Sequence, residues 1–191
     1  MRTTILSLLL FMTFAYASAQ ESNDTILNVK QKVLSINQES DYWISTFDNE
    51  AFLDSAFIHQ AGKGYGKLTG YFKNGKVCKI RELIGIKLMH DFAVTEYYFS
   101  NGKLIYVNEM EKQGPDIFID SDGTVDQRID EPTFEAEYYY YNDTLISTAE
   151  KGDRKTMLLP DPNFFDSMSK EGQLLLSARK YYQLFSRKYK E

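Results

Sequence analysis

Three stretches of the chain repeat one pattern: GYFKNGKV at residues 70–77, YYFSNGKL at 97–104 and YYYYNDTL at 138–145. In each stretch an aromatic run leads into two turn residues and then into a β-branched or aliphatic run. Asn-Gly between two apolar runs is a strong β-hairpin signal, because a type I′ turn requires positive φ at both central residues. We therefore expect antiparallel hairpins near residues 67–86, 94–113 and 134–153.

The repeats predict which side chains share a face of the sheet. In a hairpin with two turn residues, strand positions pair outward from the turn, and paired residues lie on the same face. The first pairs are assigned to the main core: Phe72 with Val77, Phe99 with Leu104, and Tyr140 with Leu145. The second pairs are assigned to the opposite face: Tyr71 with Cys78, Tyr98 with Ile105, and Tyr139 with Ile146. Asp143 replaces glycine in the third turn, which predicts a strained or longer turn there.

A sheet that is apolar on both faces must be covered twice or must expose aromatic surface. One interpretation is a tyrosine platform edged by two glutamates, which would suit a protein partner, an extended peptide or a glycan. The candidate binding residues of this platform are Tyr71, Tyr98, Tyr139, Glu96 and Glu137. The other interpretation is that helices at the two ends of the chain cover this face.

Helical periodicity lies on both sides of the hairpin region. Apolar residues recur at helical spacing from Ile26 to Ile36, and again from Leu174 to Phe185. A short strand is predicted at residues 43–47. The fold class expected is α+β, with an antiparallel sheet of consecutive hairpins flanked by an N-terminal and a C-terminal amphipathic helix.

The first nineteen residues have the features of a signal peptide. Arg2 supplies the positive region, residues 5–14 are apolar, and Ala17-Ser18-Ala19 provides small residues for cleavage. We expect an exported protein, periplasmic or extracellular, without a stable membrane anchor after cleavage. Residues 20–191 would form a single α+β domain. Cys78 is the only cysteine, so no intramolecular disulfide can form.

Few residues suggest chemistry. The formal net charge is −5 and no basic run interrupts the sheet region, so nucleic acid is not an expected partner. Asp120, Asp122 and Asp126 are a weak calcium candidate, but their spacing does not match an EF-hand loop. His59 and His90 lack neighbours at metal-ligand spacing. We therefore expect no enzyme activity, no cofactor and no metal site.

The segment EYYFSNGKLIYVNEME at residues 96–111 resembles two kinds of protein. The three hairpins resemble variant MORN-type repeats. The whole layout resembles small exported bacterial envelope proteins of unknown function that carry YYFxNGKL-type hairpins. This resemblance implies a non-enzymatic bacterial envelope protein. From the residues we expect a binding or interaction module that uses an aromatic sheet face or a sheet edge to contact another envelope or extracellular protein. An extracytoplasmic hydrolase acting through His59 or His90, and a carrier of small apolar ligands, stay open as alternatives.

Overall fold

The structure is a computed structural model that describes residues 23–48, 64–86, 91–112, 132–154 and 169–188. The chain divides into two compact units, Met1–Gln38 and Glu39–Glu191. Within the first unit, residues 23–38 form a helix, as the apolar spacing predicts. The second unit contains the sheet and the C-terminal helix.

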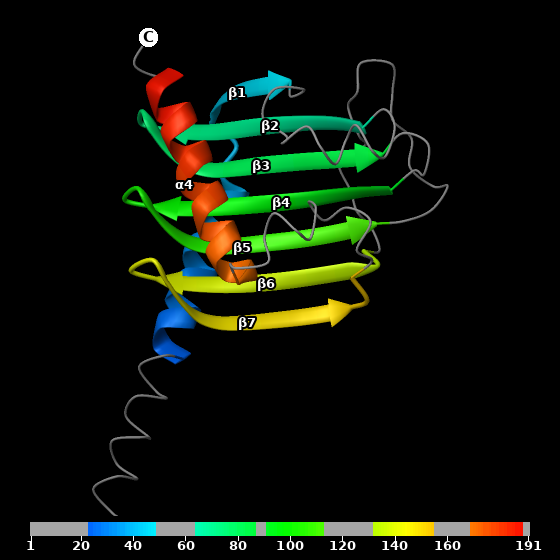
Figure 1. Cartoon of the computed structure of the whole chain (residues 1–191). Helices are drawn as coiled ribbons and strands as arrows, with labels where there is room; N and C mark the ends of the chain where they lie inside the picture. The colour runs from blue at the N-terminus through cyan, green and yellow to red at the C-terminus, as the bar shows by residue number, and fades with distance from the viewer. Residues whose placement is uncertain (1–22, 49–63, 87–90, 113–131, 155–168, 189–191) are drawn as a thin grey trace, which may run out of the picture. The chain divides into compact units, whose positions relative to one another are not determined.

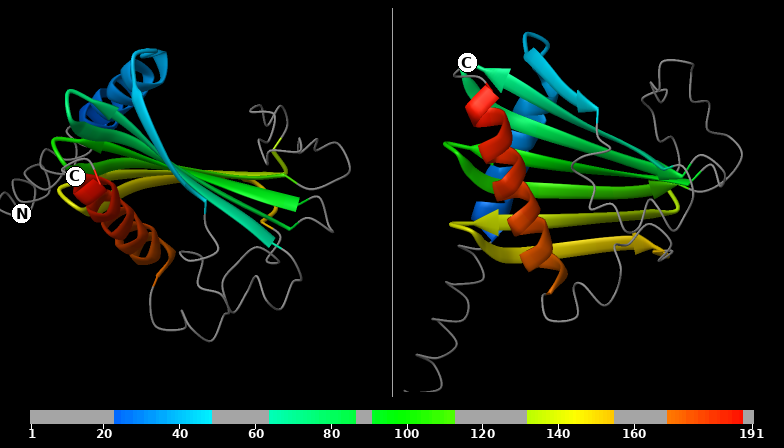
Figure 2. Two further views of the ribbon diagram at one scale, coloured as in Figure 1. Left: turned by 90° about the horizontal axis from the view of Figure 1, so that it is seen from above. Right: turned by 45° about the horizontal axis from the view of Figure 1, so that its top comes forward.

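The second unit is a seven-stranded antiparallel sheet in which every strand pairs with its neighbours in sequence (Figure 1). Its helix, α4, crosses the strands on one face, and Figure 2 shows the twist of the sheet beside it. The predicted α+β class is therefore confirmed. The elements are β1 (Trp43–Asp48), β2 (Gly64–Lys73), β3 (Lys76–Ile86), β4 (Asp91–Ser100), β5 (Lys103–Lys112), β6 (Phe134–Tyr141), β7 (Thr144–Gly152) and α4 (Lys170–Lys188).

All three repeats form hairpins with two turn residues. Asn74, Asn101 and Asn142 have φ near +50°, and each is followed by a second residue with positive φ. Asp143 has φ +62° in the third turn, so this turn has the same length as the other two. The expectation of a longer turn is wrong, because aspartate can occupy the left-handed region.

The first pair next to each turn is confirmed, whereas the second is wrong in all three hairpins. Tyr71 pairs with Lys79, Tyr98 with Tyr106, and Tyr139 with Ser147. The physical reason is a register shift in each hairpin, which skips Cys78, Ile105 and Ile146. A β-bulge of this kind places two residues opposite one and reverses the alternation of faces beyond it.

One face of the sheet packs against α4, and we call it the α4 face. Four residues of α4 with spacings of four, three and four are buried there: Leu174, Ala178, Tyr181 and Phe185. This spacing is the apolar stripe of an amphipathic helix. The core beneath it includes the first-pair residues of all three hairpins, as predicted, although Leu145 is only partly buried.

Gly70 lets the helix approach β2 closely. A Cβ atom at this position would lie 2.7 Å from Cδ1 of Phe185, well inside van der Waals contact. Phe185 also packs its ring against Phe72 and Phe47, with centroids 5.9 and 5.0 Å away. The missing side chain of Gly70 therefore provides the volume that the Phe185 ring fills.

Candidate functional site

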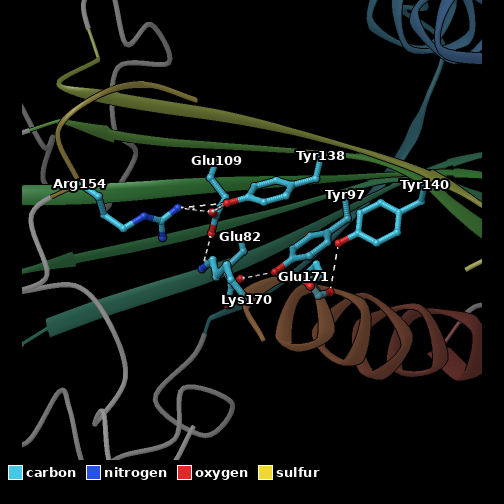
Figure 3. A network of polar contacts seen from close by, with 8 residues as sticks. All are labelled: Glu82, Tyr97, Glu109, Tyr138, Tyr140, Arg154, Lys170 and Glu171. Carbon is cyan, nitrogen blue, oxygen red and sulfur yellow. Dashed lines mark hydrogen bonds and ion pairs between the residues drawn. The ribbon is translucent and has the colours of Figure 1, made fainter. Parts of the chain in front are cut away.

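A cluster of carboxylates and tyrosines lies on the α4 face, beneath the start of α4 (Figure 3). Glu82 of β3 pairs with Thr95 of β4, which in turn pairs with Glu109 of β5. Strands in a sheet lie about 4.8 Å apart, so the backbones of the two glutamates are about 10 Å apart. Both glutamate side chains are buried.

Glu82 is held by two tyrosine hydroxyls. Tyr97 donates to Oε2 at 3.0 Å, and Tyr181 of α4 donates to Oε1 at 2.5 Å. Burial raises the pKa of Glu82, and this effect exceeds the opposing effect of the two hydrogen bonds. Glu82 thus links β3 and β4 to the middle of α4 through a carboxyl group that resists ionisation.

Glu109 has a different set of partners. Arg154 donates to Oε2 at 2.6 Å, Lys170 lies 2.7 Å from Oε1, and the hydroxyl of Tyr138 donates to Oε2 at 3.1 Å. Burial by itself would raise the pKa of Glu109, but Lys170 and Arg154 outweigh it and the pKa is lowered. Glu109 therefore stays ionised and links β5 to the first residue of α4.

This cluster fastens the helix to the sheet. A third contact between the sheet and α4 lies near the start of the helix, where the hydroxyl of Tyr140 donates to the carbonyl oxygen of Glu171 at 3.1 Å. Both carboxylate oxygens of Glu82, and both of Glu109, already accept from side chains of the protein. The geometry is best explained as an anchor for α4. Sequence reasoning missed it, although both glutamates stand eight residues after a turn asparagine.

The second face of the sheet carries the residues of the predicted tyrosine platform. Tyr98 and Tyr139 are only 1% and 3% exposed, and Tyr71 is partly buried. The rings of Tyr98 and Tyr139 each contact the ring of Tyr106, with centroids 5.4 and 5.1 Å apart. Of the two interpretations of this face, the open platform is therefore wrong: two of its three rings belong to a buried tyrosine row, in which Tyr106 is central.

The two predicted glutamates of this face do meet the tyrosines. Glu96 accepts a hydrogen bond from Tyr98 at 2.6 Å, and Glu137 accepts from Tyr139 at 2.9 Å. Glu96 also lies 2.8 Å from the ammonium group of Lys79. Tyr106 donates to the other oxygen of Glu137 at 2.7 Å, so the oxygens of both glutamates are engaged inside the protein. Sequence reasoning missed Tyr106 because the bulge puts it, rather than Ile105, opposite Tyr98.

The C-terminal half of β7 is the most exposed part of the sheet. Residues 148–152, which we call the β7 edge, are all exposed. They lie on the last strand of the sheet, and no described strand pairs with their outer side. The strand contains no proline, and its only register shift lies next to the turn. An exposed edge of this kind, whose outer side pairs with no other described strand, is a template for pairing with another strand.

The backbone groups of the β7 edge can be assigned a direction. The N–H of Asp153 donates to the carbonyl oxygen of Thr133 at 3.2 Å. Because antiparallel positions alternate between bonding toward the partner strand and away from it, Ala149 bonds toward β6. By the same alternation Thr148 and Glu150 direct their N–H and C=O groups outward. These groups are available to an added strand.

Other predicted residues lie outside the described residues, namely the calcium candidates Asp120, Asp122 and Asp126 and the histidines His59 and His90. Among the residues that are described, no group of three or more His, Cys, Asp or Glu side chains could hold a metal ion. Neither helix in the described ranges combines the length and the apolar character needed to cross a membrane.

Comparison of the chain with protein-family models, with curated proteins and with solved structures found no match.

Proposed function

We propose that the protein is an exported, non-catalytic interaction module that binds an extended segment of another protein along the β7 edge. The observation that carries this proposal is the row of exposed residues from Thr148 to Gly152 on a terminal strand. In this mode of recognition the main chain of the strand supplies affinity, and alternate side chains supply specificity.

The location outside the cytoplasm is proposed from the first nineteen residues, which have the charge, apolar length and small residues of a signal peptide. The partner is accordingly sought among envelope or extracellular proteins. Burial of Tyr98 and Tyr139 favours the edge over the aromatic face as the binding surface.

The proposal is tested with a phage-displayed library of random decapeptides selected on the purified protein. Peptides that bind should protect the amides of Thr148 and Glu150 from hydrogen exchange. The variant Thr148→Pro removes an outward N–H and leaves the bonds to β6 intact, because proline is tolerated at edge positions whose N–H points away from the sheet. Its matched control, Thr148→Val, keeps the N–H and the branched shape.

We expect Thr148→Pro to weaken peptide binding about five- to tenfold, since one hydrogen bond contributes roughly 1 kcal/mol. Thr148→Val should bind as the unmodified protein does. A library that gives no binders would contradict the proposal. So would binders whose affinity is the same for both variants, because they would occupy another surface.

A further inference from the structure

The three hairpins place a glutamate at the same position of their second strands. Glu82, Glu109 and Glu150 each follow their turn asparagine by eight residues. The register puts all three in one row across the α4 face, since Glu109 pairs with Ala136 and Ala136 pairs with Glu150. They are therefore equivalent members of one repeated arrangement.

The two inner glutamates meet the next strand in the same way. Glu82 lies opposite Thr95 and accepts a hydrogen bond from Tyr97, two residues further along β4. Glu109 lies opposite Ala136 and accepts a hydrogen bond from Tyr138, two residues further along β6. In both cases a small residue, a glutamate and a tyrosine follow one another in the strand that supplies the hydroxyl.

Glu150 is exposed and lies on the last strand of the sheet, so no described strand follows it with a tyrosine. In a strand added beside β7, the glutamate of this small residue–glutamate–tyrosine triplet would lie on the face of the sheet opposite α4. Glu96 lies opposite Arg81 and also contacts Lys79, so in the first interface this carboxylate is held by cations. On β7 the positions equivalent to Arg81 and Lys79 are Ala149 and Ser147, and the cation of this face is Lys151, which is exposed two residues beyond Ala149.

We propose that the partner strand carries a small residue, then glutamate, then tyrosine, and that it continues the sheet antiparallel to β7. The small residue would lie opposite Glu150 and the glutamate opposite Ala149, one diagonal step from the ammonium group of Lys151. The tyrosine would lie opposite Thr148 and donate its hydroxyl to Glu150. This inference rests on the proposed function, and it adds the chemistry of the partner.

A suitable probe is the synthetic peptide DFAVTEYYFS, the sequence of β4, which contains the triplet Thr95-Glu96-Tyr97. Its affinity for the purified protein is measured by fluorescence polarisation. One control peptide replaces the first tyrosine by phenylalanine and so removes a single hydroxyl. A second control peptide replaces the glutamate by glutamine. The matching protein variants are Glu150→Gln and Lys151→Gln, both at exposed positions.

The phenylalanine peptide should bind the unmodified protein about tenfold more weakly, because a hydrogen bond to a charged group is among the stronger ones. Against Glu150→Gln the two peptides should differ by less than about threefold. The glutamine peptide should lose about two- to threefold, as an exposed ion pair does. That loss should vanish against Lys151→Gln.

The outcomes separate this inference from the proposed function. If the peptide binds and is sensitive to Thr148→Pro, but the hydroxyl makes no difference, the tyrosine rule is overturned and the edge function stands. If neither this peptide nor any library peptide binds, both fall. A chain that pairs β7 with β7 of a second copy, seen as concentration-dependent mass by sedimentation, and that rejects the peptide also overturns the inference.

Discussion

Glu82 and Glu109 occupy equivalent positions in two successive hairpins, yet their surroundings shift their pKa values in opposite directions. Each is buried and each accepts a tyrosine hydroxyl from the following strand. Among the described residues, Glu109 lies within ion-pair distance of two cations, Arg154 and the first residue of α4, Lys170, whereas Glu82 has none. The pKa of Glu82 is raised and that of Glu109 is lowered. The repeat places the carboxylate, and residues outside the repeat decide its charge.

Removing the charge of Glu109 should have the largest effect. In Glu109→Gln, the guanidinium of Arg154 and the ammonium of Lys170 lose their common carboxylate. Breaking a buried ion pair costs about 3–5 kcal/mol, and because both cations are partly exposed we expect about 2 kcal/mol here. Urea unfolding followed by circular dichroism measures this loss. An unchanged unfolding midpoint would mean that Glu109 does not hold α4.

Deleting one tyrosine hydroxyl that donates to each carboxylate sharpens the comparison between Glu82 and Glu109. Tyr181→Phe takes away one of the two donors to Glu82, and we expect it to lower the free energy of unfolding by about 1–2 kcal/mol. Tyr138→Phe should lower it by about 0.5–1 kcal/mol, because Glu109 keeps two cationic partners. Paired denaturant titrations give the difference. Equal losses would show that the cations do not distinguish the two sites.

The pH dependence of the free energy of unfolding should distinguish the carboxyl of Glu82 from that of Glu109 without removing any packed side chain. A raised folded-state pKa means that the folded protein binds this proton more tightly than the unfolded chain does. Glu82 therefore contributes stability that is fully present below about pH 4.5 and is lost as pH rises through its folded pKa. Glu109 contributes stability that is present above about pH 4.5 and is lost as pH falls through its folded pKa.

We accordingly expect Glu82→Gln to flatten the stability profile above pH 4.5, by about 1.4 kcal/mol for each unit by which the pKa is raised. The profile below pH 4.5 should keep its slope, to which Glu109 contributes. Thermal unfolding at a series of pH values provides the comparison. A variant that changes the acidic limb instead would assign the raised pKa to another group.

Much of the fold could be predicted from local signals. The turn residues fix each hairpin and its first pair, because positive φ at two successive positions is possible for few residue types. The stripe from Leu174 to Phe185 predicts α4 by the same kind of local periodicity. These elements depend on residues close together in the sequence, and they are confirmed.

The site could not be predicted, because its geometry depends on the bulges. Without the extra residue at Cys78, strict alternation puts Glu82 on the same face as Tyr71. With it, Glu82 turns to the α4 face, where Tyr181 reaches it. A one-residue change of register exchanges the two faces of a strand. The equal spacing of three glutamates from three asparagines was the available signal.

The contact between Phe185 and Gly70 also relates the length of α4 to the number of strands that it crosses. Phe185 lies over β2, and Glu171, fourteen residues earlier, is bonded to Tyr140 of β6. Those fourteen residues of helix span about 21 Å, and the four strand spacings between β2 and β6 span about 19 Å. One more hairpin inside the sheet would add roughly 10 Å and require about two further turns of helix. Gain or loss of a repeat is therefore tied to the length of the C-terminal segment.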